Sequence, residues 1–274
     1  MAAIEENDTL SFQPLYDDAI DGANDVDGNG RIVERYIVSA PRSGLNWTRH
    51  CMQHFYGQPI PGSEIAAQSD VASSVAFQRS HDALHWTHWR GTGHWQKLPP
   101  EKIRGGRYAL ILRDPLGSFP RMAKKKIRLF GLYPGNIRWF SQVDVHARAV
   151  FYYEDLVTQP ERMLALFEHF QLTAAPGFQT PNLQMMRDDW QAIGKRSRAA
   201  YDKEKANGGG AMTKDQPTDF TFHQRNLSED EKQKVWRFLK RKLTDDEFGL
   251  LSRYAPAYQV RPQSPFQVAS DFLR

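Results

Sequence analysis

The sequence predicts an α/β fold in which a central parallel sheet is flanked by helices. Short apolar runs alternate with amphipathic stretches from Arg31 onward, and this alternation is typical of α/β domains. One run, Tyr108–Leu112, is apolar at every position, as expected for a strand that helices cover on both faces. Of the 274 residues, 40% are apolar and 25% are charged, which is the composition of an ordinary globular protein with a sizeable core.

The predicted elements follow one another in chain order. We expect four strands, at Tyr36–Ala40, Val75–Phe77, Tyr108–Leu112 and Ala149–Tyr153. A glycine-containing turn after the first strand leads into a helix from about Asn46 to Phe55. A second helix is expected after Pro160, because apolar residues recur there at helical spacing and proline is favoured in the first helical turn.

Two helix starts are predicted near the C-terminus. Ser228–Glu231 has the serine and glutamate spacing of a capping box, in which each side chain accepts a hydrogen bond from the other residue's backbone N–H. It is expected to open a helix that runs to about Leu243, and Thr244–Glu247 repeats the pattern immediately afterwards,.

Two regions lack the periodicity of regular elements. The first thirty residues are polar, and we expect an acidic, irregular N-terminal arm over residues 1–30. The stretch from Lys195 to Phe220 is basic, contains three consecutive glycines and has almost no apolar periodicity, which predicts a mobile loop at about residues 200–220. We expect residues 31–274 to form a single α/β domain that includes this loop.

The charge is distributed unevenly along the chain. Eight of the 32 acidic residues and none of the 36 basic residues lie in the first thirty positions, so the remainder carries a net charge of +12 although the whole chain carries +4. An excess of this size indicates an anionic ligand. Composition alone leaves four candidates open: nucleic acid, a phosphate-rich cofactor, an acidic substrate and a membrane surface.

Cysteine content and hydropathy indicate the compartment. The single cysteine, Cys51, excludes an internal disulfide,. The N-terminus lacks the basic start and apolar stretch of a secretion signal,, and the longest apolar runs are too short to span a bilayer,. We therefore expect a soluble, cytoplasmic protein without a membrane span.

The turn after the first predicted strand has the composition of an anion site. It reads Ser39-Ala-Pro-Arg-Ser-Gly-Leu-Asn-Trp47. A junction of a buried strand with a helix directs unpaired backbone N–H groups and the positive end of the helix dipole at one point, and Arg42 adds a fixed charge there. The G-x-x-x-x-G-K-[S/T] pattern of nucleoside triphosphatases is absent,. A plain polar turn is the alternative interpretation of these residues taken alone.

Four segments, in order, resemble the motifs of the sulfotransferases that use 3′-phosphoadenosine 5′-phosphosulfate (PAPS). They are Pro41–Trp47, which is similar to the family's P-[K/R]-S-G-T-T-W loop, and Arg79–His81, Leu110–Pro115 and Phe151–Leu156. The resemblance runs from about Tyr36 to Leu172 and extends weakly to Leu243. It implies a P-loop NTPase-like sulfotransferase fold, PAPS as the sulfuryl donor and 3′-phosphoadenosine 5′-phosphate (PAP) as the product.

The resemblance also implies catalytic roles. Arg42 would lie on the bridging and 5′-phosphate oxygens, where its permanent charge stabilises the leaving group. Arg79 would hold the sulfuryl oxygens, and His81, with an intrinsic pKa near neutrality, would take the acceptor's proton. Catalysis of this kind is mainly alignment and charge neutralisation, so no metal is required.

The implied nucleotide-binding residues fall in three of the segments. Those of the phosphosulfate loop are Arg42, Ser43, Gly44, Leu45, Asn46 and Trp47. Trp47 and Tyr153 match positions that pack on the adenine ring. Arg113 matches the arginine that binds the 3′-phosphate, the group that distinguishes PAPS from its unphosphorylated precursor.

Two departures from the family pattern affect this site. Leu45 replaces a residue with a hydroxyl group, which removes one donor from the loop. The family's serine, eight residues after the arginine, falls on Arg121, so that Arg121 or Ser118 would serve the 3′-phosphate.

The family closes the 3′-phosphate site with a late basic segment that contains glycine. The first candidate here is Gly194–Arg198, in which Lys195 and Arg196 would bind the phosphate. The second candidate is His223–Asn226.

The acceptor is expected to be a hydroxyl or amine of a small molecule or carbohydrate. Its pocket would come from the aromatic segment 81–95 and from the loop at 206–216. Segment 81–95 contains four histidines and three tryptophans, but it has no cysteine and its spacings match no zinc finger, so no metal is expected. Lys124–Lys126 with Arg128 would steer the anionic cofactor.

A second class of function stays open from the sequence. The same scaffold could carry a non-catalytic protein that binds nucleic acid or an anionic glycan. The intact Arg79-x-His81 element favours the enzyme, because a binding protein has no need of a positioned base,. We therefore expect no nucleic-acid partner, and the sequence leaves the oligomeric state open.

Overall fold

A parallel sheet forms the centre of the molecule. The computed structural model describes residues 34–57, 77–84, 97–123, 125–206, 220 and 224–255. The described strands are β1 (Arg35–Ser39), β2 (Gln78–Ser80), β3 (Arg107–Leu112) and β4 (Arg148–Tyr152). They pair in the order β2-β1-β3-β4, and all three pairings are parallel. The predicted α/β class and its parallel sheet are confirmed.

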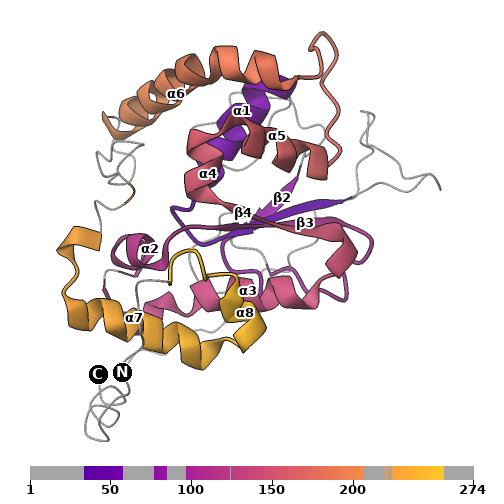
Figure 1. Cartoon of the computed structure of the whole chain (residues 1–274). Helices are drawn as coiled ribbons and strands as arrows, with labels where there is room; N and C mark the ends of the chain where they lie inside the picture. The colour runs from indigo at the N-terminus through magenta and orange to yellow at the C-terminus, as the bar shows by residue number, and fades with distance from the viewer. Residues whose placement is uncertain are drawn as a thin grey trace, which may run out of the picture.

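Helices lie on both sides of this sheet (Figure 1). They are α1 (Leu45–Tyr56), α2 (Pro115–Met122), α3 (Leu132–Gln142), α4 (Tyr153–Thr158), α5 (Pro160–His169), α6 (Leu183–Ala206), α7 (Glu229–Lys242) and α8 (Asp245–Gly249). Three short 3₁₀ turns are η1 (Ile127–Phe130), η2 (Val145–Ala147) and η3 (Gln224–Asn226). Figure 1 shows α1, α5 and α6 on one side of the sheet and α3 and α7 on the other.

The two faces of the sheet support separate hydrophobic cores. Val38 and Leu110 are paired in register and point to the core shared with α2, α3 and α7. Ile37 and Ala109, one position earlier, point to the core shared with α1, α5 and α6. Because successive side chains of a strand alternate between faces, strands covered on both sides are apolar at every position, which explains the uninterrupted run in β3.

The predicted helix starts agree with the structure. Helix α7 begins with a capping box between Ser228 and Glu231, and α8 begins with another between Thr244 and Glu247. Pro160 is the first residue of α5. Each of these signals acts within one helical turn, so the local sequence is sufficient to specify it.

Three predicted boundaries are wrong. The second strand is Gln78–Ser80, whereas Phe77 precedes it as a buried residue and 75–76 lie outside the described residues. Strand β4 ends at Tyr152, and Tyr153 begins α4. Helix α6 continues to Ala206, so 195–206 are helical and do not belong to a loop. This stretch lacks apolar periodicity, but its Lys, Arg, Glu and Ala residues have high helix propensity.

Several predictions fall on residues outside the described ranges. These are the acidic arm at 1–30, residues 85–95 of the predicted aromatic segment, Lys124, His223, and the remainder of the predicted loop at 207–219. Among the described residues, no helix has both the length and the apolar character needed to cross a membrane.

Candidate functional site

The helices that follow the two central strands of the sheet pack on opposite faces of it. Strands β1 and β3 are neighbours, yet α1, which follows β1, packs on one face and α2, which follows β3, packs in the core of the other. The turns after these strands, 40–44 and 113–114, therefore emerge side by side at the carboxyl edge of the sheet. Ligands of open α/β sheets bind at such a point.

The turn after β1 has an unusual backbone. Arg42 has φ 72° and Gly44 has φ 88°, so both adopt the left-handed conformation. A Cβ atom at Gly44 would lie 2.3 Å from a ring carbon of Tyr153. Glycine is therefore required at position 44 for its conformation and for the close approach of the Tyr153 ring.

Arg113 joins this turn to the start of α4. Its side chain is only 3% exposed, and Nη1 donates to the Arg42 carbonyl at 2.8 Å. The guanidinium lies 4.5 Å from the centre of the Tyr153 ring, a cation–π arrangement. Three of the segments that resemble sulfotransferase motifs thus meet in direct contact.

The fourth such segment, Arg79–His81, is also adjacent. His81 Nδ1 lies 2.7 Å from the Ser39 carbonyl oxygen; when Nδ1 carries the proton and donates to that oxygen, Nε2 carries the lone pair that a general base needs. Asn136 of α3 donates to the His81 carbonyl at 2.9 Å and accepts from the Ala83 N–H at 3.1 Å. Asn136 is 1% exposed, and it fixes the turn that carries His81.

Four buried polar atoms at this edge of the sheet have no hydrogen-bond partner among the described residues. They are Ser39 Oγ, Ser43 Oγ, Ser118 Oγ and Arg113 Nε. Leaving a buried donor or acceptor unpaired costs about 1–3 kcal/mol, so a group of them indicates a ligand that satisfies them. The donors fit the oxygens of phosphate and sulfuryl groups.

Two buried arginines, Arg49 of α1 and Arg79 of β2, lie close enough for their charges to interact. Arg79 is 5% exposed and Arg49 is fully buried. Burial lowers the pKa of Arg79 to about 10, and burial together with the charge of Arg79 lowers the pKa of Arg49 to about 9. Arg49 Nη1 lies 3.5 Å from Asn46 Oδ1. Sequence reasoning missed Arg49, although an arginine among the inward-facing positions Thr48 and Met52 of α1 is a signal that could have found it.

The start of α2 carries an unusual carboxylate. Asp114 caps the helix, because Oδ1 accepts from the Leu116 N–H at 2.7 Å. Burial, with a further contribution from the charge of Glu154, raises the pKa of Asp114 to about 6. Ser118 and Arg121 are the two residues expected as alternatives at the 3′-phosphate. Ser118 is buried within α2, whereas Arg121 is half-buried in the last turn of that helix.

The two aromatic residues expected at adenine have partners within the chain. Trp47 Nε1 donates to the Leu156 carbonyl at 2.7 Å, and the rings of Trp47 and Trp190 pack edge to face with their centres 5.1 Å apart. The Tyr153 ring lies between Gly44 and Arg113 and forms an edge-to-face contact with the ring of Phe220. Both aromatic residues therefore lie at the site, and Phe220 brings the end of the late segment to it.

Lys195 and Arg196 are not brought to this site. Both are exposed on α6, and Arg196 Nη2 contacts His54 Nδ1 at 3.2 Å. His54 is in the last turn of α1, roughly 14 Å along the helix from its start at Leu45 by the usual rise per residue. The second candidate segment is nearer, because the Gln224 amide donates to the Asp114 carboxylate and η3 packs against α2. The structure therefore does not bring Lys195 and Arg196 to the edge of the sheet, and their assignment to the 3′-phosphate stays a prediction.

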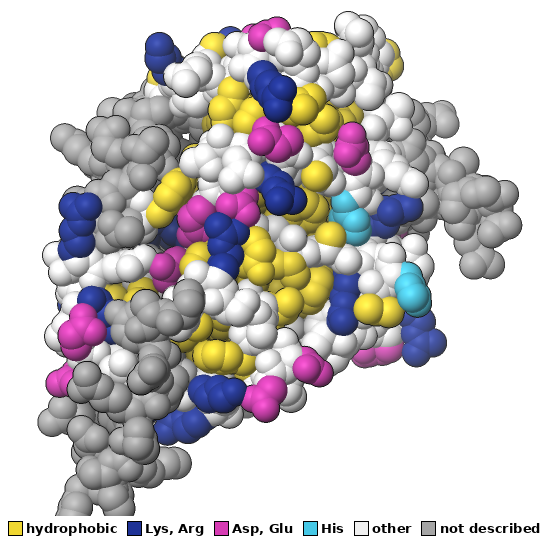
Figure 2. All heavy atoms as spheres, viewed as in Figure 1, with side chains coloured by type: hydrophobic (Ala, Val, Ile, Leu, Met, Phe, Trp, Pro, Cys, Tyr) yellow, Lys and Arg dark blue, Asp and Glu magenta, His cyan; other side chains and the backbone are white. Residues whose placement is uncertain are grey.

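One surface hollow lies away from this site. It has a volume of about 350 Å³ and lies along edge strand β4; its lining residues are Val150, Phe151, Tyr152, Asp155, Leu156, Arg162 and Arg253. Hydrophobic side chains gather in the middle of the face in Figure 2, with basic and acidic side chains around them. None of the loop residues 40–46 lines this hollow.

Comparisons with known proteins add no assignment. The chain matches no protein-family model, and no curated protein is detectably similar to it. Among the described residues, no group of three or more histidine, cysteine, aspartate or glutamate side chains is arranged to hold a metal ion.

Proposed function

We propose that the protein is a PAPS-dependent sulfotransferase with a P-loop-like fold. It would transfer the sulfuryl group of PAPS to a hydroxyl or amine of a small-molecule or carbohydrate acceptor. One observation carries the proposal: four segments with family-like residues, far apart in the sequence, converge at the carboxyl edge of the sheet. Three assigned residues there, Ser43, Arg113 and Ser118, have buried polar atoms without a partner among the described residues.

The residues of the turn after β1 would bind the 5′ end of the donor. Gly44 is the cap residue of helix α1, and among the described residues no side chain caps this helix and no acidic residue lies in its first turn. Its first N–H groups and dipole therefore favour an anion. Arg42 and Ser43 would add a charge and a hydroxyl, and Arg42 would stabilise the negative charge that develops on the leaving phosphate.

The residues at the start of α2 would bind the 3′-phosphate. Arg113 Nε and Ser118 Oγ are both unpaired among the described residues, and a Cβ atom at Gly117 would lie 3.7 Å from Arg113 Nε. One phosphate group with several acceptor oxygens would satisfy both donors. This accounts for an otherwise costly burial.

His81 and Arg79 would act on the transferred group. In the transfer, a bond from the acceptor oxygen or nitrogen to sulfur forms while the bond from sulfur to the bridging phosphate oxygen breaks. The acceptor's proton would go to His81 Nε2, and PAP would leave with the electron pair of the broken bond. Arg79 would neutralise the sulfuryl oxygens during the transfer.

Binding and turnover test this proposal together. We expect PAP to bind at micromolar or lower dissociation constant by calorimetry, and labelled PAPS to transfer sulfate to a member of an acceptor panel. The variant His81→Ala should lose about 10²- to 10⁴-fold in kcat and retain PAP affinity. The matched control is His146→Ala, which removes an exposed histidine in η2 and should change neither quantity.

Two results would overturn the proposal. The first is the absence of micromolar binding of both PAP and PAPS. The second is binding of nucleic acid or an anionic glycan that weakens steeply with salt and that PAP does not compete away, which would identify a non-catalytic anion-binding protein.

A further inference from the structure

One peptide group at the site is held from both sides by side chains. The Tyr133 hydroxyl donates to the Arg113 carbonyl at 2.5 Å, and the Asp114 N–H donates to Glu154 Oε1 at 3.1 Å. The carbonyl and the N–H belong to the same peptide group. Fixing both ends of that group restricts ψ of Arg113 and φ of Asp114, and these two angles set the direction of the Arg113 side chain relative to α2.

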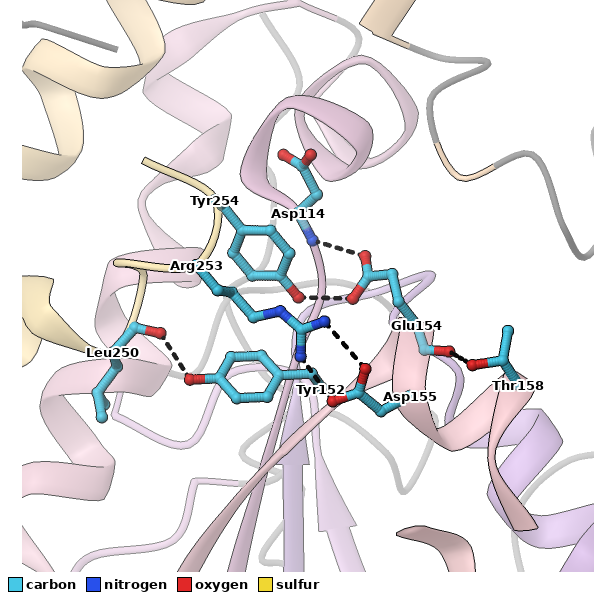
Figure 3. Close-up of polar contacts among 8 residues, drawn as sticks. All are labelled: Asp114, Tyr152, Glu154, Asp155, Thr158, Leu250, Arg253 and Tyr254. Carbon is cyan, nitrogen blue, oxygen red and sulfur yellow. Dashed lines mark hydrogen bonds and ion pairs between the residues drawn. The ribbon is translucent and has the colours of Figure 1, made fainter. Parts of the chain in front are cut away.

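The carboxylate that holds this peptide is itself held by a residue one hundred positions later. The Tyr254 hydroxyl donates to Glu154 Oε2 at 2.5 Å. Figure 3 shows the Tyr254 hydroxyl and the Asp114 N–H reaching the two oxygens of this carboxylate. Burial and the charge of Glu154 raise the pKa of Tyr254 far above its ordinary value, so the hydroxyl keeps its proton and remains a donor.

The turn that contains Tyr254 has separate anchors. Arg253 donates to both oxygens of Asp155, at 2.6 and 2.9 Å, and its guanidinium lies 4.4 Å from the centre of the Tyr152 ring. The Tyr152 hydroxyl donates to the Leu250 carbonyl at 3.0 Å. Figure 3 shows these contacts beside the Glu154 carboxylate. The turn therefore stays attached to β4 and α4 without the Tyr254 hydroxyl.

We propose that Tyr254 is a positioning residue for nucleotide binding: through Glu154 it holds the Arg113–Asp114 peptide in the orientation that directs the Arg113 guanidinium at the 3′-phosphate. This inference rests on the proposed function. It assigns a role to the turn after α8, which no sequence motif includes. It also gives Glu154 a task beyond packing, because its carboxylate connects the turn to the site.

The geometry around Arg113 makes its orientation consequential. The guanidinium uses Nη1 for the Arg42 carbonyl and one face for the Tyr153 ring, while Nε remains without a partner among the described residues. A rotation of the Arg113–Asp114 peptide would move Nε from its place beside Gly117 and disturb the contact with the loop. Binding groups need placement within about 0.5 Å to retain their effect.

The test compares two tyrosine-to-phenylalanine variants, one at Tyr254 in the turn after α8 and one at Tyr152 of β4, which contacts that turn. Tyr254→Phe removes the hydrogen bond to Glu154, whereas Tyr152→Phe removes the bond to the Leu250 carbonyl and leaves Glu154 untouched. The readout is the ratio of the dissociation constants for 5′-AMP and PAP, because the two nucleotides differ only in the 3′-phosphate. We expect Tyr254→Phe to lower this ratio about fivefold or more and Tyr152→Phe to leave it within twofold of the wild type.

A double variant tests whether the effect passes through Arg113. If Tyr254 acts by orienting that guanidinium, Tyr254→Phe should change the ratio little in an Arg113→Lys background, since the lysine cannot reproduce the oriented Nε. The inference would be overturned if Tyr254→Phe lowered the ratio of the 5′-AMP and PAP dissociation constants by the same factor in the wild-type and Arg113→Lys backgrounds.

The remaining outcomes separate this inference from the proposed function. An unchanged ratio in Tyr254→Phe, or an equal fall in Tyr152→Phe, would overturn the positioning role alone, provided that the wild type prefers PAP. A wild-type protein that binds neither PAP nor PAPS would overturn the proposed function, and the positioning role with it.

Discussion

Helices α1 and α7 differ in how the backbone N–H groups of their first turns are satisfied. At α7, the Ser228 hydroxyl accepts from the Glu231 N–H at 3.2 Å, and the Glu231 carboxylate accepts from the Ser228 N–H at 2.8 Å. At α1, the cap residue is Gly44, and no described side chain caps the helix. Helix α7 is therefore closed by its own residues, whereas α1 is open to an anion.

An acidic residue at the sheet edge and one at α7 differ in the same sense. At the sheet edge, Asp114 caps α2, and burial together with the charge of Glu154 raises its pKa to about 6. At α7, burial alone would raise the pKa of Glu231, but hydrogen bonds from Ser228 and Lys125 outweigh it and lower that pKa. Charged groups at α7 are thus stabilised by folding, whereas a charged group at the sheet edge is destabilised by it. This difference is the one expected if the sheet edge binds the donor, as proposed, and α7 only supports the fold.

The largest expected effect concerns the glycine at the start of α1. Gly44→Ala would place a Cβ atom 2.3 Å from the Tyr153 ring in a left-handed conformation, and we expect a loss of about 3 kcal/mol in the free energy of unfolding. Gly177→Ala is the matched control, because φ is 86° there and, apart from its own chain neighbours, no described residue has an atom within 4 Å of the added carbon. It should cost about 1 kcal/mol, as measured by denaturant unfolding. Equal losses would show that contact with Tyr153 adds nothing.

The second prediction uses pH to compare the two acidic residues. The folded-state pKa of Asp114, about 6, is above its ordinary value of 3.8, so the folded protein binds more protons than the unfolded chain between these values. Stability from this group therefore falls as the pH rises from about 4 to 6. As the pH rises over this interval, we expect the free energy of unfolding of Asp114→Asn to increase relative to that of the wild type by about 2 kcal/mol.

The opposite slope is expected at α7. Because the folded-state pKa of Glu231 lies below its ordinary value of 4.5, its contribution is present above that value and is lost as the pH falls through the folded-state pKa. Glu231→Gln should therefore have a lower free energy of unfolding than the wild type near neutral pH, and the difference should shrink in acid. Denaturant unfolding at several pH values measures both differences, and slopes of the same sign for the two variants would contradict this account.

Sequence reasoning succeeded where one segment contains all the information. The apolar run of β3 and the capping box at Ser228 are set by residues within a few positions of one another, and both are present in the structure as expected. The turn at Arg42–Gly44 was identified for the same reason, because strand, glycine and helix follow in sequence. Its contact with Arg113 was not predicted, because the two residues lie 71 positions apart in the sequence.

Long-range contacts explain what the sequence could not predict. Strand β2 is polar, and its pairing with Tyr36–Val38 of β1 defines it, so local β propensity gave no signal. The amide of Asn136 fixes His81 from 55 positions away, and the Tyr254 hydroxyl reaches Glu154 from 100 positions away. Such partners become visible only when the fold places them side by side.

The smallest expected effect comes from comparing two serine hydroxyl groups, one without a hydrogen-bond partner among the described residues and one that caps a helix. Ser118 has a buried hydroxyl without a partner among the described residues, whereas the Ser228 hydroxyl caps α7. Ser118→Ala should leave the free energy of unfolding unchanged or raise it by up to about 1 kcal/mol, because it removes an unpaired buried group and favours the helix. Ser228→Ala should lower that free energy by about 1 kcal/mol.

For PAP affinity, Ser118→Ala should have the larger effect and Ser228→Ala the smaller one, the reverse of their effects on the free energy of unfolding. Ser118→Ala should weaken PAP binding about fivefold, since the lost hydroxyl would face the 3′-phosphate, while Ser228→Ala should leave the affinity unchanged. Calorimetric titration of both variants with PAP, alongside denaturant unfolding, measures the two quantities on the same samples. A Ser118→Ala protein that is less stable and equally tight for PAP would mean that the hydroxyl serves folding and not binding, and the distinction between the sheet edge and the start of α7 would fail at this residue.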